Sequence, residues 1–118
     1  MNVKERAKAL NETIIALRRE LHAHPEVSQD LPFAESVIVR ELSKLGLDEI
    51  KAGQGKGHGV IATLKGRKPG KVLALRADMD ALPITEETGL SFASTNGMMH
   101  ACGRRARGNV VGDRSNAD

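Results

Sequence analysis

Apolar residues recur at spacings of three and four near the N-terminus, which is the pattern of one face of an α-helix. This pattern predicts a helix from about Val3 to Leu21, whose apolar stripe consists of Ala7, Leu10, Ile14, Leu17 and Leu21. Pro25 disfavours helical geometry at His24, so the helix is expected to end before it. A second helix is predicted next, with a left-handed cap at Gly46 and a buried side made of Phe33, Ala34, Val37, Ile38, Val39, Leu42 and Leu45.

Two short runs rich in branched residues follow, and each predicts a strand. The first, Val60 to Leu64, comes after the glycine-rich segment Gly53 to Gly59. That segment is interpreted as a loop and not as a phosphate cradle, because phosphate loops follow a strand and open a helix. The second strand, Lys71 to Arg76, has a continuous apolar centre, which is typical of a strand covered on both faces in an α/β sheet. The pattern therefore predicts an α/β fold.

The composition is that of a single globular domain. The 118 residues are 40% hydrophobic and 28% charged, and roughly 100 to 200 residues make one domain. No apolar run approaches the roughly 20 residues of a membrane span, and the first residues lack the central apolar block of a signal peptide. One cysteine excludes an internal disulfide, so a cytoplasmic location is the default expectation.

The charge is too small to indicate a nucleic-acid partner. The net charge is +3, and residues 103–118 supply +2 of it, because they contain four arginines and two aspartates. The aromatic residues are Phe33 and Phe92 alone, which leaves no stacking platform for single-stranded nucleic acid. A nucleic-acid-binding module is therefore not predicted.

Two carboxylates at the end of the second predicted strand are the first candidate site. Asp78 and Asp80 are spaced so that both point the same way in extended geometry. Ligands of α/β proteins bind at such strand ends, and divalent cations accept carboxylate oxygens. The alternative is equally compatible with the spacing: both residues cap a turn or the next helix.

Two histidine-containing segments are further candidates. His100 and Cys102 are both able to ligate a transition metal, although a lone His-x-Cys is more often a satisfied histidine beside a buried thiol. His22 and His24 could offer an imidazole to a cleft, but such histidines more often only stabilise the last carbonyls of a helix. The spacing alone leaves these alternatives open.

Three segments occur in a fixed order along the chain: Leu-Arg-Arg-Glu-Leu-His-Ala-His-Pro-Glu at 17–26, Ala-Leu-Arg-Ala-Asp-Met-Asp-Ala-Leu-Pro at 74–83, and Met-His-Ala-Cys-Gly at 99–103. Together they resemble the metal-dependent amidohydrolases that cleave N-acyl amino acids, the aminoacylase-like metallopeptidases that include hippurate hydrolase and the indole-acetyl-amino-acid hydrolases. The resemblance covers residues 1–103. It implies the N-terminal part of a three-layer αβα zinc-peptidase-like catalytic domain, which is incomplete here.

The resemblance also implies a metal site and its residues. Family members bind two divalent metal ions, zinc or manganese, and are often homodimers. The metals acidify a bridging water that attacks an amide carbonyl, with a glutamate as general base. Cys102 matches the family's cysteine ligand, and Asp80 matches the strand-end aspartate that orients the metal site. The substrate implied is a small N-acyl amino acid.

The sequence departs from the family's pattern directly after Gly103. The family continues Cys-Gly-His-Asp-x-His, whereas this chain continues with Arg104, Arg105, Ala106 and Arg107. Arginine donates hydrogen bonds but has no acceptor for a cation. A family-like ending can be encoded so that removal of two nucleotides from the codon after Gly103 yields residues 103–118 as they stand. Residues 104–118 are therefore interpreted as a basic tail foreign to the family, derived from a frameshift and disordered.

Three functions remain open at this stage. The leading one is an inactive fragment of an amidohydrolase, because the general base and the remaining histidine ligands come later in the family's sequence. Its apolar strands would lack partners, so low stability and aggregation are expected. The second is part of a split enzyme that another chain complements. The third is a small binding protein whose basic tail contacts acidic partners. Whether the chain itself is an enzyme stays undecided.

Overall fold

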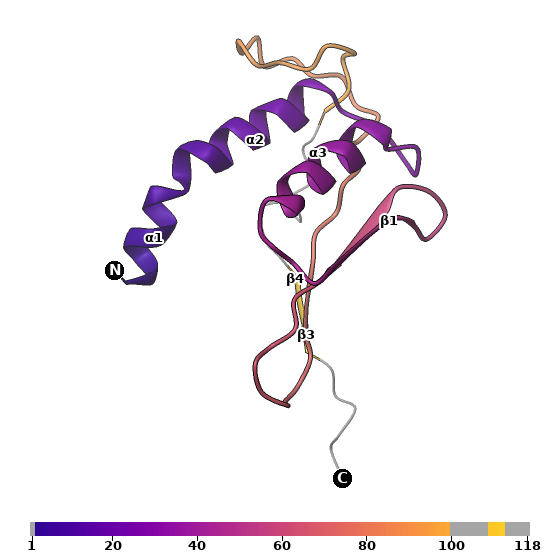
Figure 1. Ribbon diagram of the computed structural model, residues 1–118. Helices are drawn as coiled ribbons and strands as arrows, with labels where there is room; N and C mark the ends of the chain where they lie inside the picture. The colour runs from indigo at the N-terminus through magenta and orange to yellow at the C-terminus, as the bar shows by residue number, and fades with distance from the viewer. Residues whose placement is uncertain (1, 100–108, 113–118) are drawn as a thin grey trace.

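The computed structural model describes residues 2–99 and 109–112 of the chain. Three helices come first, α1 (Val3–Ala9), α2 (Asn11–Ala23) and α3 (Pro32–Ser43). The strands β1 (Glu49–Gln54), β2 (Gly59–Thr63), β3 (Leu73–Arg76) and β4 (Asn109–Gly112) follow (Figure 1). This order confirms the predicted α/β class. None of the helices in this part of the chain is long and apolar enough to span a membrane.

The predicted first helix is divided in two at Leu10. A capping box begins α1, in which Glu5 N donates to Asn2 Oδ1 at 2.9 Å and Asn2 N donates to Glu5 Oε2 at 3.2 Å. Leu10 ends α1, and α2 starts at the next residue. The prediction of one helix over 3–21 is therefore wrong in its continuity. The apolar stripe is not buried at this point, with Leu10 and Ile14 55% and 57% exposed, so packing does not enforce a straight helix.

The second predicted helix is α3, and its N-terminus is capped from a distance. Leu31 precedes it without a side-chain cap. Instead the Glu26 carboxylate accepts hydrogen bonds from Phe33 N at 3.0 Å and Ala34 N at 2.7 Å. Such a carboxylate satisfies free amides and complements the positive end of the helix dipole. Gly46 has the predicted left-handed conformation with φ of 65°, but the helix ends three residues before it.

Two strands, β1 and β4, were not predicted, and β3 is not covered as predicted. β1 pairs antiparallel with β2, with Glu49 opposite Thr63, and α3 packs on this hairpin. β3 pairs antiparallel with β4, which lies inside the predicted tail. The expectation that residues 71–76 are buried on both faces is wrong. Leu73 and Leu75 are 66% and 73% exposed, because no helix in the described part of the chain covers this pair of strands.

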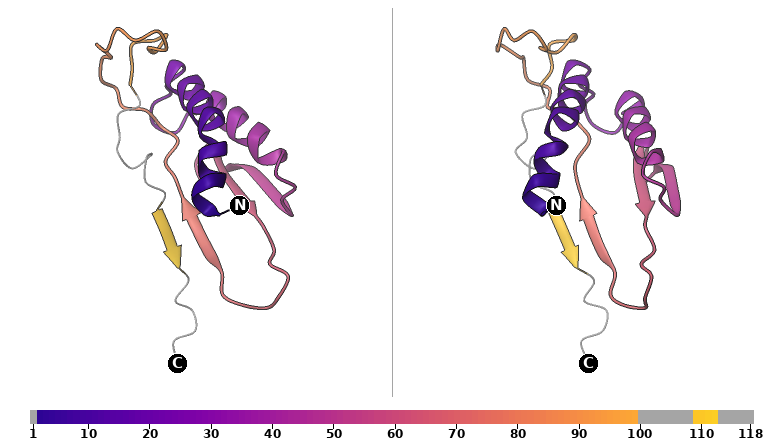
Figure 2. Two further views of the ribbon diagram at one scale, coloured as in Figure 1. Left: turned by 90° about the vertical axis from the view of Figure 1, so that its left-hand side faces the viewer. Right: turned by 60° about the vertical axis from the view of Figure 1, so that its left-hand side comes forward.

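The core is small and lies where the end of α2 meets α3. Its buried residues are His22, Pro25, Leu31, Ala34, Val37 and Ala81. Figure 2 shows α1 and α2 on one side of the molecule, with α3 and the β1–β2 hairpin on the other. Glu20 and Arg40 join α2 to α3 through two parallel hydrogen bonds of 2.9 and 2.8 Å, and the hydrogen bond from Arg40 holds the pKa of Glu20 below its usual value.

Candidate functional site

The predicted carboxylate pair lies just beyond the end of β3. Asp78 Oδ1 accepts from Arg76 Nη2 at 2.7 Å, which neutralises this carboxylate locally. Asp80 is half-buried and has an interaction partner of its own. The carboxylates at the end of β3 are therefore both engaged in the described structure, Asp78 by Arg76.

Backbone hydrogen bonds hold this strand end against the helical part of the molecule. Ala81 N donates to Glu26 O at 2.6 Å, and Val27 and Ala81 form a parallel bridge. Ala81 is 2% exposed. Glu26 therefore fixes two elements at once, because its side chain caps α3 while its carbonyl receives the residue after Asp80.

Further along the chain, Met99 returns to the segment that follows Asp80. Leu82 and Met99 form an antiparallel bridge, in which Leu82 N donates to Met99 O at 2.9 Å and Met99 N donates to Leu82 O at 3.3 Å. Met99 immediately precedes the second candidate segment, so the point at which the chain enters that segment lies two residues from Asp80. His100 and Cys102 themselves, like Arg104, lie outside the described residues.

The described residues do not make up a metal centre on their own. Among them, no group of three or more histidine, cysteine, aspartate or glutamate side chains could hold an ion. A stable transition-metal site needs three or four ligands. The donor set of this part of the chain therefore does not fit a pair of divalent metals without further residues.

A second constellation joins α2 to residues 85–99, and the sequence patterns did not predict it. His22 Nε2 faces Glu86 Oε1 in an ion pair whose two side chains are each 2% exposed. The His22 ring also meets Phe92 edge to face, with centroids 6.0 Å apart. Thr95 donates to Ala23 O through both its N and its Oγ1, each at 2.9 Å. The segment is thus fastened to the last turn of α2.

Two opposing effects act on the Glu86 carboxylate. Burial raises the pKa of Glu86, but hydrogen bonds from Thr88 and His22, together with the charge of His22, outweigh it and hold that pKa below its usual value of 4.5. Thr88 Oγ1 donates to Glu86 Oε2 at 2.8 Å, and Ser94 N donates to the same oxygen at 3.3 Å. The ionised Glu86 carboxylate therefore holds Thr88 and Ser94 of residues 85–99 together by accepting their hydrogen bonds.

We expect Glu86 to make the stability depend on pH in the acid range. Its pKa is lower in the folded chain than its usual 4.5, so its contribution is fully present above about pH 4.5 and is lost as the pH falls through the lowered value. Melting temperatures measured from pH 6 to pH 3 should therefore fall less steeply in Glu86→Gln than in the parent chain. Glu87→Gln, an exposed neighbour, is the matched control; equal slopes for Glu86→Gln and the parent would contradict the assignment.

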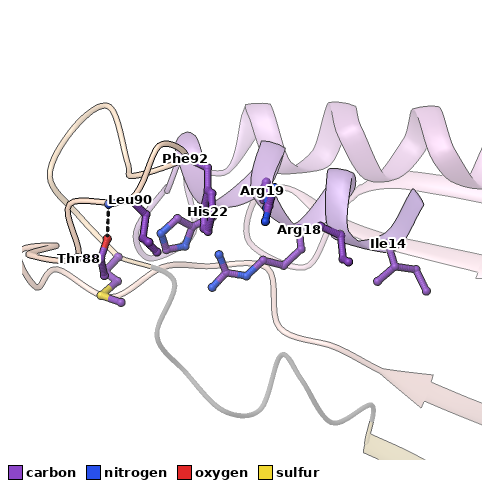
Figure 3. Close-up of a pocket in the computed structure, with 9 residues that line it drawn as sticks. Ile14, Arg18, Arg19, His22, Thr88, Leu90 and Phe92 are labelled. Atoms are coloured by element: carbon purple, nitrogen blue, oxygen red, sulfur yellow. Dashed lines mark hydrogen bonds between the residues drawn. The ribbon is translucent and has the colours of Figure 1, made fainter. Parts of the chain in front are cut away.

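An apolar pocket opens beside this constellation, between α2 and residues 85–99. It has a volume of about 370 Å³. Figure 3 shows its wall on α2, with Ile14, Arg18 and His22 along one helix face, and Thr88, Leu90 and Phe92 opposite. Met99 also lines it, so the pocket borders the chain that returns toward Asp80.

The two histidines after Leu21 have different roles. His24 stabilises a carbonyl near the end of the helix, as the second interpretation predicted, because its Nδ1 donates to Glu20 O at 3.1 Å at the end of α2. His22 instead turns inward to the pocket and Glu86. The spacing of Ile14, Arg18 and His22 places them on one helix face, a signal that could have indicated His22, whereas no local pattern marks Glu86 as its partner.

Comparison with known proteins shows to which family this chain is related. Residues 74–108 match the family described as Peptidase family M20/M25/M40. Thermostable carboxypeptidase 1 of Saccharolobus solfataricus is 42% identical over 102 residues, which are 86% of this chain and 26% of that protein. The N-acetylcysteine deacetylase of Bacillus subtilis is 47% identical over 97 residues, 81% of this chain and 25% of that protein. The chain is related to the M20 peptidase family.

The relationship extends to the backbone. A Bacillus subtilis protein described as a dinuclear metal binding peptidase from the M20 family has 46% sequence identity and a TM-score of 0.74, over 83% of this chain and 28% of that structure. Most of the helices and strands described above thus have counterparts in an M20 structure, which confirms the predicted fold class. The chain spans about a quarter of the length of the relatives it matches.

The M20 match falls on the part of the molecule that holds the first two candidate segments. It begins within β3 and includes Asp80, Leu82 and Met99. Cys102 and Arg104 also lie within the matched range, although outside the described residues. The residues that match the family model therefore include both partners of the Leu82–Met99 bridge.

Proposed function

We propose that residues 1–103 are the N-terminal part of an M20-type catalytic domain that hydrolyses the amide bond of N-acyl amino acids. Asp80 is proposed to orient the metal site and Cys102 to be a metal ligand. The 118-residue chain by itself is proposed to be inactive, with residues 104–118 a frameshift-derived tail. We further propose a cytoplasmic location, on the ground of the single cysteine, and a homodimer for the intact protein.

The observation that carries this proposal is the bridge between Leu82 and Met99. It brings the start of the Met-His-Ala-Cys-Gly segment to the residue pair next to Asp80. The bridge thereby holds the chain that leads into the Cys102 segment close to Asp80, and residues that serve one metal site must lie close together.

The names of the relatives support the proposed substrate class. An N-acetylcysteine deacetylase and a carboxypeptidase both cleave an amide next to an amino acid carrying a free carboxylate, and their sequences align with most of this chain. Zinc or manganese would be the metal, and when bound it would supply acidification of water. The described residues do not fit such a metal pair alone, so no catalytic step is assigned to this chain.

Arg104 supports the proposed inactivity. It stands where the resemblance implies a histidine ligand, and a guanidinium carries positive charge and has no acceptor for a metal ion. The neighbouring Arg105 and Arg107 add to this charge. Two divalent cations beside these groups would be repelled.

A split enzyme is the second candidate, and one observation favours it. Large apolar side chains of α1, α2 and β3 are exposed, with Val3 84%, Ile14 57% and Leu75 73% accessible. Another chain that supplies the rest of an M20 domain would cover such surfaces. In that case activity would appear only in the assembled pair.

The first test is direct. The purified 118-residue chain, supplied with zinc or manganese, should release no cysteine from N-acetylcysteine above the rate of the metal alone. Metal-dependent hydrolysis by the chain would overturn the proposed inactivity.

The nucleotide sequence beyond the codon of Gly103 tests the origin of the tail. A long continuation in another frame that encodes further histidines establishes the frameshift, and the absence of such a continuation from every frame rejects it.

A further inference from the structure

The pocket beside α2 combines apolar walls with two cationic side chains. Ile14, Ile15, Leu90, Phe92 and Met99 supply most of its lining. Its volume of about 370 Å³ is within the range of about 300 to 1,000 Å³ of small-molecule sites. A ligand that fits must therefore bury a small apolar body.

The charge at the pocket comes from Arg18 and Arg19. In Figure 3 the Arg18 side chain extends from α2 along the pocket toward residues 85–99. The guanidinium of Arg19 stacks over Phe92, with its Cζ 4.4 Å from the ring centroid. A stacked guanidinium keeps its in-plane N–H groups for an anion. Within residues 2–99, neither arginine forms an ion pair with a carboxylate.

The other polar groups of the pocket are already engaged. His22 faces Glu86, and Thr88 Oγ1 donates to the same carboxylate. The groups left for a ligand's polar end are thus the two guanidinium groups, which bind carboxylates in preference to neutral groups.

We propose that this pocket binds a small monocarboxylate with an apolar tail, the tail lying against Leu90 and Phe92 and the carboxylate against Arg18 and Arg19. The inference goes beyond the proposed amide hydrolysis and does not depend on it, since Asp80 is not among the lining residues in the part of the chain that the structure describes. A neutral molecule of the same shape would leave both cations without a partner, and an anion without a tail would leave the apolar wall in water.

Octanoate is the probe, and the uncharged octan-1-ol is its comparison. Titrated into the ¹⁵N-labelled full chain, octanoate should shift the amide signals of Ile15, Thr88 and Leu90 in a saturable way. Octan-1-ol should bind about tenfold more weakly, because its neutral hydroxyl cannot form a charge-assisted hydrogen bond with either guanidinium as a carboxylate can. Absence of saturable shifts, or equal affinity for the alcohol, would overturn the proposal.

Paired variants locate the site. Arg18→Ala should raise the Kd for octanoate about tenfold, whereas Arg6→Ala on α1 should leave it unchanged. Ile14→Asp places a negative charge at the pocket and should abolish binding, while Leu45→Asp, at a residue 66% exposed and away from the pocket, should not. Circular dichroism of each variant verifies that the helices are retained. Equal losses in Ile14→Asp and Leu45→Asp would show that octanoate binds apolar surface generally, which contradicts a defined site.

Discussion

Replacing His22 with alanine should lower the melting temperature by roughly 10 °C, the size expected when a buried partner is removed from a small domain. The substitution leaves the Glu86 carboxylate without the side chain that its Oε1 faces. It also removes the edge-to-face contact with Phe92. Two of the contacts that fasten residues 85–99 to α2 are thereby lost at once.

His24→Ala is the matched control for this prediction. His24 is exposed and makes one hydrogen bond to a helix carbonyl, so its loss should lower the melting temperature by only a few degrees. Hydrogen exchange adds a local readout, because the amides of Glu86 and Thr95 bond to Gly97 O and Ala23 O. They should lose protection in His22→Ala before the amides of α3 do. Equal melting curves for His22→Ala and the parent would refute the assigned role of the pair.

Elements governed by local sequence were predictable. The end of α2 follows from Pro25, the left-handed Gly46 from helix-capping rules, and β2 from its run of branched residues. β1 was missed because Glu-Ile-Lys-Ala-Gly-Gln consists mostly of residues with low strand propensity, and it is a strand through its pairing with β2. Tertiary pairing outweighs propensity in such a segment.

The errors concern burial, which depends on what surrounds an element. The apolar centre of β3 is that of a covered strand, and the stripe on α1 and α2 is that of a helix packed on a core. β3 and the N-terminal part of the stripe are exposed here, while Leu17 and Leu21 are half-buried. The relatives of the M20 family are about four times as long as the matched segment. The sequence pattern therefore reflects an environment that these 118 residues do not supply by themselves.

The candidate site shows the same division between local and long-range signals. Asp80 is a candidate because of its place after an apolar strand, and Cys102 is a candidate because of its resemblance to a family motif; both remain predictions. That the chain returns to Leu82 at Met99 could not be predicted, because sixteen residues of irregular chain separate them in sequence. The partnership of His22 with Glu86 is hidden for the same reason.

Activity of a completed domain should depend on Asp80 and Cys102. A chimera in which residues 1–103 of this chain replace the matching segment of the Bacillus subtilis N-acetylcysteine deacetylase should hydrolyse N-acetylcysteine when metal is supplied. Asp80→Ala and Cys102→Ser should each lower kcat/KM by more than about a hundredfold, since a misplaced or missing metal ligand removes stabilisation that arises only in the transition state.

Asp30→Ala is the control for the chimera, because the Asp30 side chain is 92% exposed and its loss should leave kcat/KM within about twofold. Metal content measured on each purified variant separates two kinds of failure. An inactive chimera that retains two metal ions would contradict the substrate class, whereas one that binds no metal would contradict the proposed contribution of residues 1–103 to the site. A second chimera carries residues 104–118 of this chain in place of the deacetylase's own continuation. It should lose both metal binding and activity, because Arg104 then stands where a ligand is required.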